Sequence, residues 1–132
     1  MRLLLDTHTL IWAIASPDRL PPAARSAIRD AANDVFASLA SAWEISIKVA
    51  LRRLDLDARS LAEALAASGM EPLGISLEHA ARVATLPPHH RDPFDRMLVA
   101  QALCESLTLV SRDREIARYG VEMLWREAPR AR

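Results

Sequence analysis

Short apolar runs alternate along this sequence with longer segments in which apolar residues recur at helical spacing. Residues 3–5 are consecutive leucines, and residues 107–110 form a second run that is polar only at Thr108. Runs of this kind are typical of strands that are buried on both faces. Their alternation with helical segments predicts an α/β fold, an open, mostly parallel twisted sheet with helices on both faces.

The expected elements are short and follow one another closely. We predict strands at residues 2–5, 35–37, 72–75, 107–110 and 121–124. Helices are predicted at residues 7–14, 23–32, 41–51, 61–67, 79–86 and 94–105, with a short helix around Ile116. The 132 residues show no internal repeat and no linker, so we expect a single domain spanning residues 1–132.

Composition and charge narrow the class of protein. Hydrophobic residues make up 51% and charged residues 26%, which supplies a packed core and argues against disorder. The 17 basic and 17 acidic residues balance, so any nucleic-acid site must come from a local arrangement of charge. Cys104 is the lone cysteine and cannot form an intrachain disulfide. No apolar run has the length of a signal peptide or a membrane span, and we expect a soluble, cytoplasmic protein.

Four acidic residues stand where a parallel sheet would gather them. Asp6 follows the first expected strand, and Asp113 follows the strand at residues 107–110. Ligands bind open α/β sheets beyond the carboxyl ends of the strands, so these two carboxylates come close if their strands are neighbours. Glu44 and Asp95 lie in apolar helical segments, and we expect them at the same end of the sheet.

Carboxylates crowded in this way repel one another unless a cation is bound or some of their pKa values rise. Hard oxygen ligands suit Mg²⁺ or Mn²⁺, and the sequence holds no cluster of cysteines and histidines that would favour a softer metal. A cation held by the four acids would activate a water molecule and stabilise the charge that develops on a phosphodiester.

Several of these acids also have a purely structural interpretation. Asp6, Asp92 and Asp113 each precede an expected helix and are suited to cap its N-terminus. Asp95 stands three residues after Asp92, at the capping-box position. Taken one at a time, the capping interpretation equals or outweighs the functional one, and only the gathering of the acids favours a site.

Glu44 stands four residues before Lys48, the only lysine, and this spacing predicts an ion pair on the helix surface. The apolar neighbours of Glu44 predict that its own position is largely covered. The histidines are expected outside any metal site: His89 and His90 in an exposed loop after two prolines, and His8 packed under the first helix or against substrate. Trp12, Trp43 and Trp125 are expected to be core or interface residues.

Four segments carry a resemblance to a known family. They are LLDTHTLIW at residues 4–12, SAWEISIK at 41–48, HRDPFDR at 90–96 with LVAQA at 98–102, and LVSRD at 109–113 with LW at 124–125. In this order and spacing, the chain resembles the VapC-type toxins of the PIN-domain superfamily over nearly its whole length.

The resemblance implies a PIN-like fold, endoribonuclease activity that depends on Mg²⁺ or Mn²⁺, a homodimer, and neutralisation by a cognate antitoxin protein. The catalytic and metal-binding residues that it implies are Asp6, Glu44, Asp95 and Asp113. We expect substrate-binding or supporting roles for their neighbours Lys48, Asp92, Arg96, Ser111, Arg112 and Arg114.

Arginines crowd the segments that carry the acids, although the formal net charge is zero. They predict a basic rim around an acidic centre, at which guanidinium groups neutralise RNA phosphates. The alternative is that they form exposed ion pairs, each of little value for stability. The arginines concerned are Arg91, Arg96, Arg112, Arg114 and Arg118.

The chain departs from the family pattern after the helix that carries Glu44. Where related toxins often have a glycine, this sequence has Arg52 and Arg53. Because an arginine is strained in a left-handed helix cap, we expect this helix to end in a different way.

Other classes with an aspartate after the first strand fit less well. A phosphatase of the haloacid dehalogenase type needs a second aspartate two residues later, where this chain has His8. A phospho-acceptor receiver domain needs a lysine late in the chain, and the only lysine is Lys48. The remaining alternative is a PIN-like binding or scaffold domain without catalysis, against which the four intact acids argue.

Overall fold

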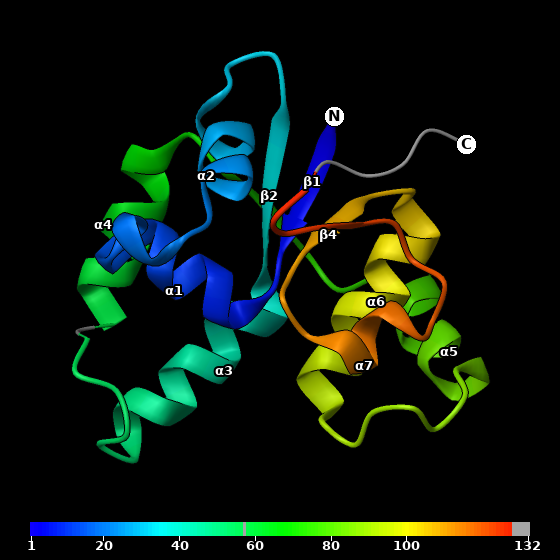
Figure 1. Ribbon diagram of the computed structural model, residues 1–132. Helices are drawn as coiled ribbons and strands as arrows, with labels where there is room; N and C mark the ends of the chain where they lie inside the picture. Colours follow the sequence, from blue (N-terminus) through cyan, green and yellow to red (C-terminus); the bar gives the residue numbers. More distant parts are fainter. Residues whose placement is uncertain (57, 128–132) are drawn as a thin grey trace.

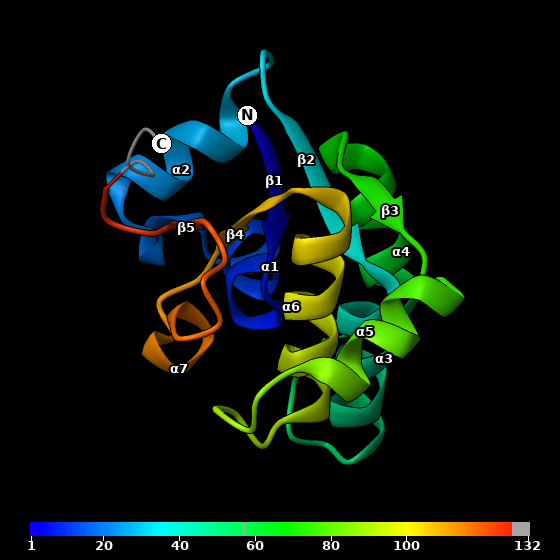
Figure 2. The same cartoon turned by 90° about the vertical axis from the view of Figure 1, so that its right-hand side faces the viewer.

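The computed structural model describes residues 1–56 and 58–127, and within these residues it contains a sheet of five parallel strands. The strands are β1 (Arg2–Leu5), β2 (Asp34–Ser38), β3 (Glu71–Leu73), β4 (Thr108–Val110) and β5 (Met123–Leu124). Their order across the sheet is β3-β2-β1-β4-β5, so the chain runs outward from β1 first to one edge and then to the other (Figure 2). The expected parallel α/β architecture is confirmed.

Helices cover both faces of this sheet (Figure 1). One face carries α1 (Thr7–Ala15), α2 (Pro22–Arg29), α3 (Leu39–Ala50) and α4 (Ala58–Ser68), and a 3-10 turn spans Pro17–Arg19. The other face carries α5 (Leu77–Thr85), α6 (Pro93–Glu105) and α7 (Arg114–Ala117). None of the helices in the described residues is long and apolar enough to cross a membrane.

The leucines of β1 explain why this strand is apolar at consecutive positions. Leu3 and Leu5 pack into the cluster under α1 to α4, whereas Leu4 packs into the cluster under α6 and α7. All three side chains are fully buried. Successive side chains of a strand point to opposite faces, so a central strand covered on both faces must be apolar throughout.

Several boundaries differ from the sequence-based prediction for local reasons. Helix α3 begins at Leu39, two residues earlier than expected, because Ser38 caps it: the Ser38 hydroxyl accepts a hydrogen bond from Ala40 N at 3.0 Å. Helix α2 ends at Arg29, where Asp30 leaves the helical conformation. Strand β5 is limited to Met123–Leu124, and β3 is the edge strand predicted for the segment that contains Pro72.

The apolar stripe on α3 faces outward, so of the two expected positions for Trp43, core or interface, the core position is wrong and the interface position stays a prediction. The Trp43 side chain is 60% exposed and its neighbour one turn on, Ile47, is also exposed. The buried face of the helix contains instead Ala40, Glu44 and Ile45. Helical spacing identifies a stripe of side chains but does not say on which side the sheet lies.

The C-terminus of α3 ends in the left-handed conformation that we expected the arginine to avoid. Arg52 has a φ of 57°, and its N–H donates to Val49 O at 3.0 Å while Arg53 N donates to Lys48 O at 2.9 Å. This pair of bonds is the Schellman motif, which usually places a glycine at the position of Arg52. The helix therefore keeps the common cap geometry and accepts the strain of a side chain there.

We predict that Arg52→Gly raises the free energy of unfolding by about 1 kcal/mol, because glycine adopts the left-handed conformation without steric cost. Urea denaturation measures the change. The control is Arg53→Gly, at an exposed neighbour with ordinary backbone geometry, which should lower the free energy of unfolding by about 0.5–1 kcal/mol. Equal effects of the two substitutions would show that Arg52 is not strained.

Candidate active site

The carboxyl ends of β1 and β4 lie side by side and bring two of the predicted acids together. Leu5 pairs with Val110 in the parallel register, and Asp6 N donates to Val110 O at 3.1 Å. Asp6 follows β1 directly, and Asp113 comes three residues after β4. A cavity of about 560 Å³ opens at this edge and is lined by Asp6, Thr7, His8, Ile11, Glu44, Lys48, Asp92, Asp95, Arg112, Asp113 and Arg114. All four predicted acids are among these residues.

Asp6 combines a capping contact with a place in the cavity. It is the N-cap of α1, and its Oδ1 accepts a hydrogen bond from Thr9 N at 2.8 Å. The residue is only 6% exposed. The capping and cavity-lining interpretations are thus compatible, since a carboxylate has four lone-pair positions and the cap occupies one of them.

Glu44 reaches the cavity from α3 and is held by two donors. The Lys48 Nζ lies 2.8 Å from Glu44 Oε2, as the helical spacing predicted, and the Thr7 hydroxyl donates to Glu44 Oε1 at 2.7 Å. Glu44 is 8% exposed, which confirms the prediction that its position is largely buried. Thr7 was not singled out by the sequence analysis, although it stands next to Asp6; its hydroxyl also lies 3.0 Å from that of Ser41.

The N-terminus of α6 presents two aspartates with different surroundings. Asp92 is the N-cap, and its Oδ1 accepts from Phe94 N at 2.8 Å and from Asp95 N at 3.2 Å, as predicted. Burial, and after it the charge of Asp92, raises the pKa of the Asp95 carboxyl to about 7. The more distant charges of Asp6 and Glu44 add to the rise, and His90 opposes it.

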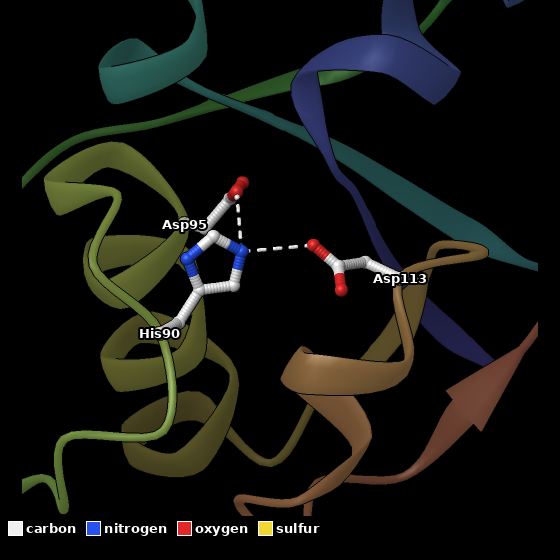
Figure 3. Close-up of side chains that lie close together, drawn as sticks. All are labelled: His90, Asp95 and Asp113. Atoms are coloured by element: carbon white, nitrogen blue, oxygen red, sulfur yellow. Dashed lines mark hydrogen bonds and ion pairs between the residues drawn. The ribbon is translucent and has the colours of Figure 1, made fainter.

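His90 lies between two of the acids, which corrects the expectation that it is an exposed loop residue. Its Nε2 is 2.8 Å from Asp113 Oδ2 and 3.2 Å from Asp95 Oδ2 (Figure 3). The side chain is 18% exposed. Partial burial lowers the pKa of His90, but the hydrogen bond to Asp113 and the nearby carboxylate charges outweigh it, and the pKa lies above its usual value.

Asp113 and Ser111 shape the turn after β4. The Asp113 Oδ1 accepts from Glu115 N at 2.8 Å and so caps α7, while Oδ2 accepts from His90. The buried Ser111 hydroxyl accepts from Asp113 N at 3.0 Å. Ser111 therefore has a supporting contact in this turn and does not line the cavity.

The basic residues divide into two groups. Lys48, Arg112 and Arg114 line the cavity, and the Arg112 guanidinium also lies 4.9 Å from the centre of the Trp12 ring. Arg118, by contrast, forms an exposed ion pair with Glu115 at 3.0 Å. For this arginine the alternative prediction, an exposed ion pair, is confirmed.

Arg96 turns away from the acids and supports the loop that precedes them. Its guanidinium donates to the carbonyls of Pro87, Val83 and Leu86 and to the Tyr119 hydroxyl, at 2.9 to 3.3 Å. Hydrogen bonds to main-chain carbonyls from a planar fork of donors fix the path of a loop. Of the five arginines predicted to form a basic rim, only Arg112 and Arg114 line the cavity.

Residues 3–122 match the family model of the PIN domain. The chain belongs to the PIN domain family. Over 118 residues it is 34% identical to Ribonuclease VapC22 of Mycobacterium tuberculosis, an alignment that covers 86% of this chain and 88% of that protein.

Solved structures share the architecture at lower sequence identity. VapBC2 from Rickettsia felis, crystallised with a DNA fragment from its promoter, gives a TM-score of 0.67 at 16% identity, covering 94% of this chain and 98% of that chain. A toxin–antitoxin complex from Klebsiella pneumoniae gives a TM-score of 0.66 at 19% identity, with 96% and 98% covered. The expected PIN-like fold is confirmed.

We predict that Thr7→Val lowers the free energy of unfolding by about 1.5–3 kcal/mol, because it removes a hydrogen bond to a buried carboxylate. Urea denaturation measures the loss. Thr9→Val is the matched control: the Thr9 hydroxyl is equally buried but donates to a neutral group, Val110 O, so about 1 kcal/mol should be lost. A Thr7 variant no less stable than the Thr9 variant would contradict the assigned hydrogen bond from Thr7 to Glu44.

Proposed function

We propose that this chain is an endoribonuclease, the toxin of a toxin–antitoxin pair, that hydrolyses RNA phosphodiesters with Mg²⁺ or Mn²⁺ as cofactor. The observation that carries this proposal is a cavity at the carboxyl end of a parallel sheet, lined by five acids, among them the four predicted ones, with basic side chains beside them. The ribonuclease that is 34% identical over most of this chain supports the same activity. We assign the catalytic and metal-binding roles to Asp6, Glu44, Asp95 and Asp113.

The donor set of the cavity fits a hard divalent cation. Its acids offer carboxylate oxygens, the ligands that Mg²⁺ and Mn²⁺ prefer. Burial, and after it the charge of Asp92, raises the pKa of Asp95, and a bound cation would favour the ionised carboxylate. The cation would supply a Lewis acid that lowers the pKa of a water molecule and neutralises charge on the phosphate.

The other residues of the site bind and orient the substrate in this proposal. Arg112 and Arg114 stand at the cavity with Asp113, where they neutralise the RNA backbone on either side of the bond to be cut. Lys48 holds the Glu44 carboxylate in place through their 2.8 Å contact. Both ring nitrogens of His90 are engaged by protein groups, so this ring does not serve as a base toward a 2′-hydroxyl. We therefore expect water to attack phosphorus and leave a 5′-phosphate and a 3′-hydroxyl.

An exposed apolar surface on α3 supports the proposal that this chain binds other proteins. Leu39, Trp43, Ile47 and Leu51 stand at every fourth residue along one side of this helix and are exposed. Large contiguous apolar patches on a protein surface mark sites of contact with other proteins. We propose that the chain forms a homodimer, binds a cognate antitoxin and acts as a single domain in the cytoplasm, where its RNA substrate is found.

The second candidate function is a PIN-like binding or scaffold domain without catalysis. The four acids disfavour it, because a site without a cation gains nothing from carboxylates that repel one another. Titration of the purified protein with Mn²⁺ in a calorimeter distinguishes the two, since a scaffold has no reason to bind the metal.

We predict that Asp6→Asn and Asp95→Asn each abolish cleavage of RNA in the presence of Mn²⁺, while the free energy of unfolding stays equal or rises because repulsion is relieved. Gel analysis of cleaved total RNA and urea denaturation measure the two quantities. Asp34→Asn, an exposed position at the opposite end of β2, is the matched control and should cleave like the wild type.

Asp92→Asn should also retain activity, because asparagine is an equally good N-cap. Cleavage that persists in excess EDTA, or products that end in a 2′,3′-cyclic phosphate, would contradict the metal-dependent mechanism.

We predict that replacing both Arg112 and Arg114 by alanine flattens the salt dependence of RNA binding. In an Asp6→Asn background the RNA stays uncleaved, and the slope of log affinity against log salt should fall by about 0.7 for each phosphate that is no longer neutralised, or about 1.4 for the two arginines together. Arg118→Ala, which removes an arginine already paired with Glu115, is the control and should leave the slope unchanged. An unchanged slope in the double variant would show that these arginines do not contact phosphate.

A further inference from the structure

His90 is the one described histidine whose ring touches two of the proposed metal-binding acids (Figure 3). A histidine among carboxylates has two conceivable roles toward a cation. It can ligate the cation through a ring nitrogen that carries no proton, or it can donate a hydrogen bond from a protonated nitrogen and so orient carboxylates that ligate the cation. Which nitrogen carries the proton decides between the two.

The backbone of Asp92 fixes the position of that proton. Asp92 N lies 3.0 Å from His90 Nδ1, and a backbone N–H is always a donor. His90 Nδ1 is therefore the acceptor in this bond, and the proton of the neutral ring is on Nε2. Nε2 is also the nitrogen that faces Asp113 Oδ2 and Asp95 Oδ2, two groups that only accept when ionised.

We propose that His90 is a positioning residue, a fixed hydrogen-bond donor that orients Asp95 and Asp113 toward the cation and does not itself ligate it. This inference rests on the metal-dependent function proposed above. To become a ligand, Nε2 would have to lose its proton to Nδ1, and Nδ1–H would then oppose the Asp92 N–H donor directly. Each carboxylate oxygen has two lone pairs, so an oxygen that accepts from His90 can still face a cation.

The loop around His90 is held in a way that keeps the ring in place. His90 N donates to the Tyr119 hydroxyl at 2.9 Å, and Arg96 Nη1 donates to the same oxygen at 3.1 Å. The other Arg96 bonds run to main-chain carbonyls just before this loop. The backbone of His90 is thus anchored by Tyr119, outside the cavity, and Nδ1 is anchored by the backbone of Asp92, so that Nε2 alone is directed at Asp95 and Asp113.

The His90 ring joins two acids that cannot hydrogen-bond to each other when both are ionised. Asp95 comes from the first turn of α6, and Asp113 from the turn after β4. Both are negatively charged when ionised, so direct contact between them is repulsive. A donor placed between them ties these two segments at 2.8 and 3.2 Å and fixes the separation of their oxygens before a cation arrives.

Two isosteric substitutions separate a donor from a ligand. His90→Gln keeps an N–H donor, whereas His90→Glu offers an oxygen ligand and no donor. We expect His90→Ala to weaken Mn²⁺ binding, measured by calorimetry without RNA, by about 10–100-fold, the usual loss when a group that orients metal ligands is removed. His90→Gln should recover most of this loss and His90→Glu should not. His89→Ala, at the adjacent histidine outside the cavity, is the control and should bind Mn²⁺ like the wild type.

Tighter binding by His90→Glu than by His90→Gln would overturn the proposal, and so would an alanine variant that binds as tightly as the wild type. If the wild type itself bound no Mn²⁺, the proposed metal dependence would fail together with this role. If the wild type bound Mn²⁺ and the His90 variants did not differ from it, this role alone would fail.

The position of the ring proton gives a second, independent measurement. Long-range ¹H–¹⁵N correlation spectra of histidine-labelled protein in mildly alkaline buffer should show His90 protonated at Nε2. Diamagnetic Mg²⁺ should leave that proton in place. Transfer of the proton to Nδ1 on addition of Mg²⁺ would identify His90 as a ligand and contradict the inference.

Discussion

Repulsion among the carboxylates at the carboxyl ends of β1 and β4 sets the conditions that the rest of the site must meet. Asp6, Glu44, Asp95 and Asp113 line one cavity of about 560 Å³, and two of them are almost fully buried. Ionised groups in such a place are stable only with donors or opposite charge close by. The chain supplies donors from several directions: the backbone N–H of Thr9 and Glu115, the Thr7 hydroxyl, and the charged Lys48. Burial and the charge of Asp92 outweigh the contact of Asp95 with His90, and the pKa of Asp95 is raised.

The same geometry explains why capping and metal-binding interpretations could not be separated position by position. In a parallel sheet each strand leads into a helix, and the N-termini of those helices lie at the edge where ligands bind. Asp6 and Asp113 are N-caps of the helices that follow β1 and β4, and Asp92 is the N-cap of α6, whose N-terminus lies at the same cavity. A helix N-terminus stabilises a carboxylate through its free N–H groups and its dipole, so an acid placed there is both a good cap and an ionised group at the site. One oxygen of such a side chain can cap the helix while the other faces the cavity.

Much of the fold and the placement of the acids could be predicted because they depend on local signals. Consecutive leucines before Asp6 mark a strand buried on both faces, and the Asp92-Pro93 pair marks the start of α6. The outward face of Trp43 could not be predicted, since periodicity does not identify the side on which the sheet lies. Nor could the position of His90, which depends on bonds to Tyr119 and Asp113, more than 20 residues away along the chain.

Departures from local preference at Arg52 and at Asp95 differ in kind. Arg52 accepts a left-handed backbone to complete the cap of α3, and this strain lies in backbone geometry that a glycine would relieve. Asp95 accepts burial beside other acids, and here the cost is electrostatic and would be relieved by a cation. Proteins keep local conflicts mainly where function requires them. By that criterion Asp95 is the better mark of function, because replacing it with a neutral residue would ease folding and, under the proposed function, remove a ligand of the divalent ion.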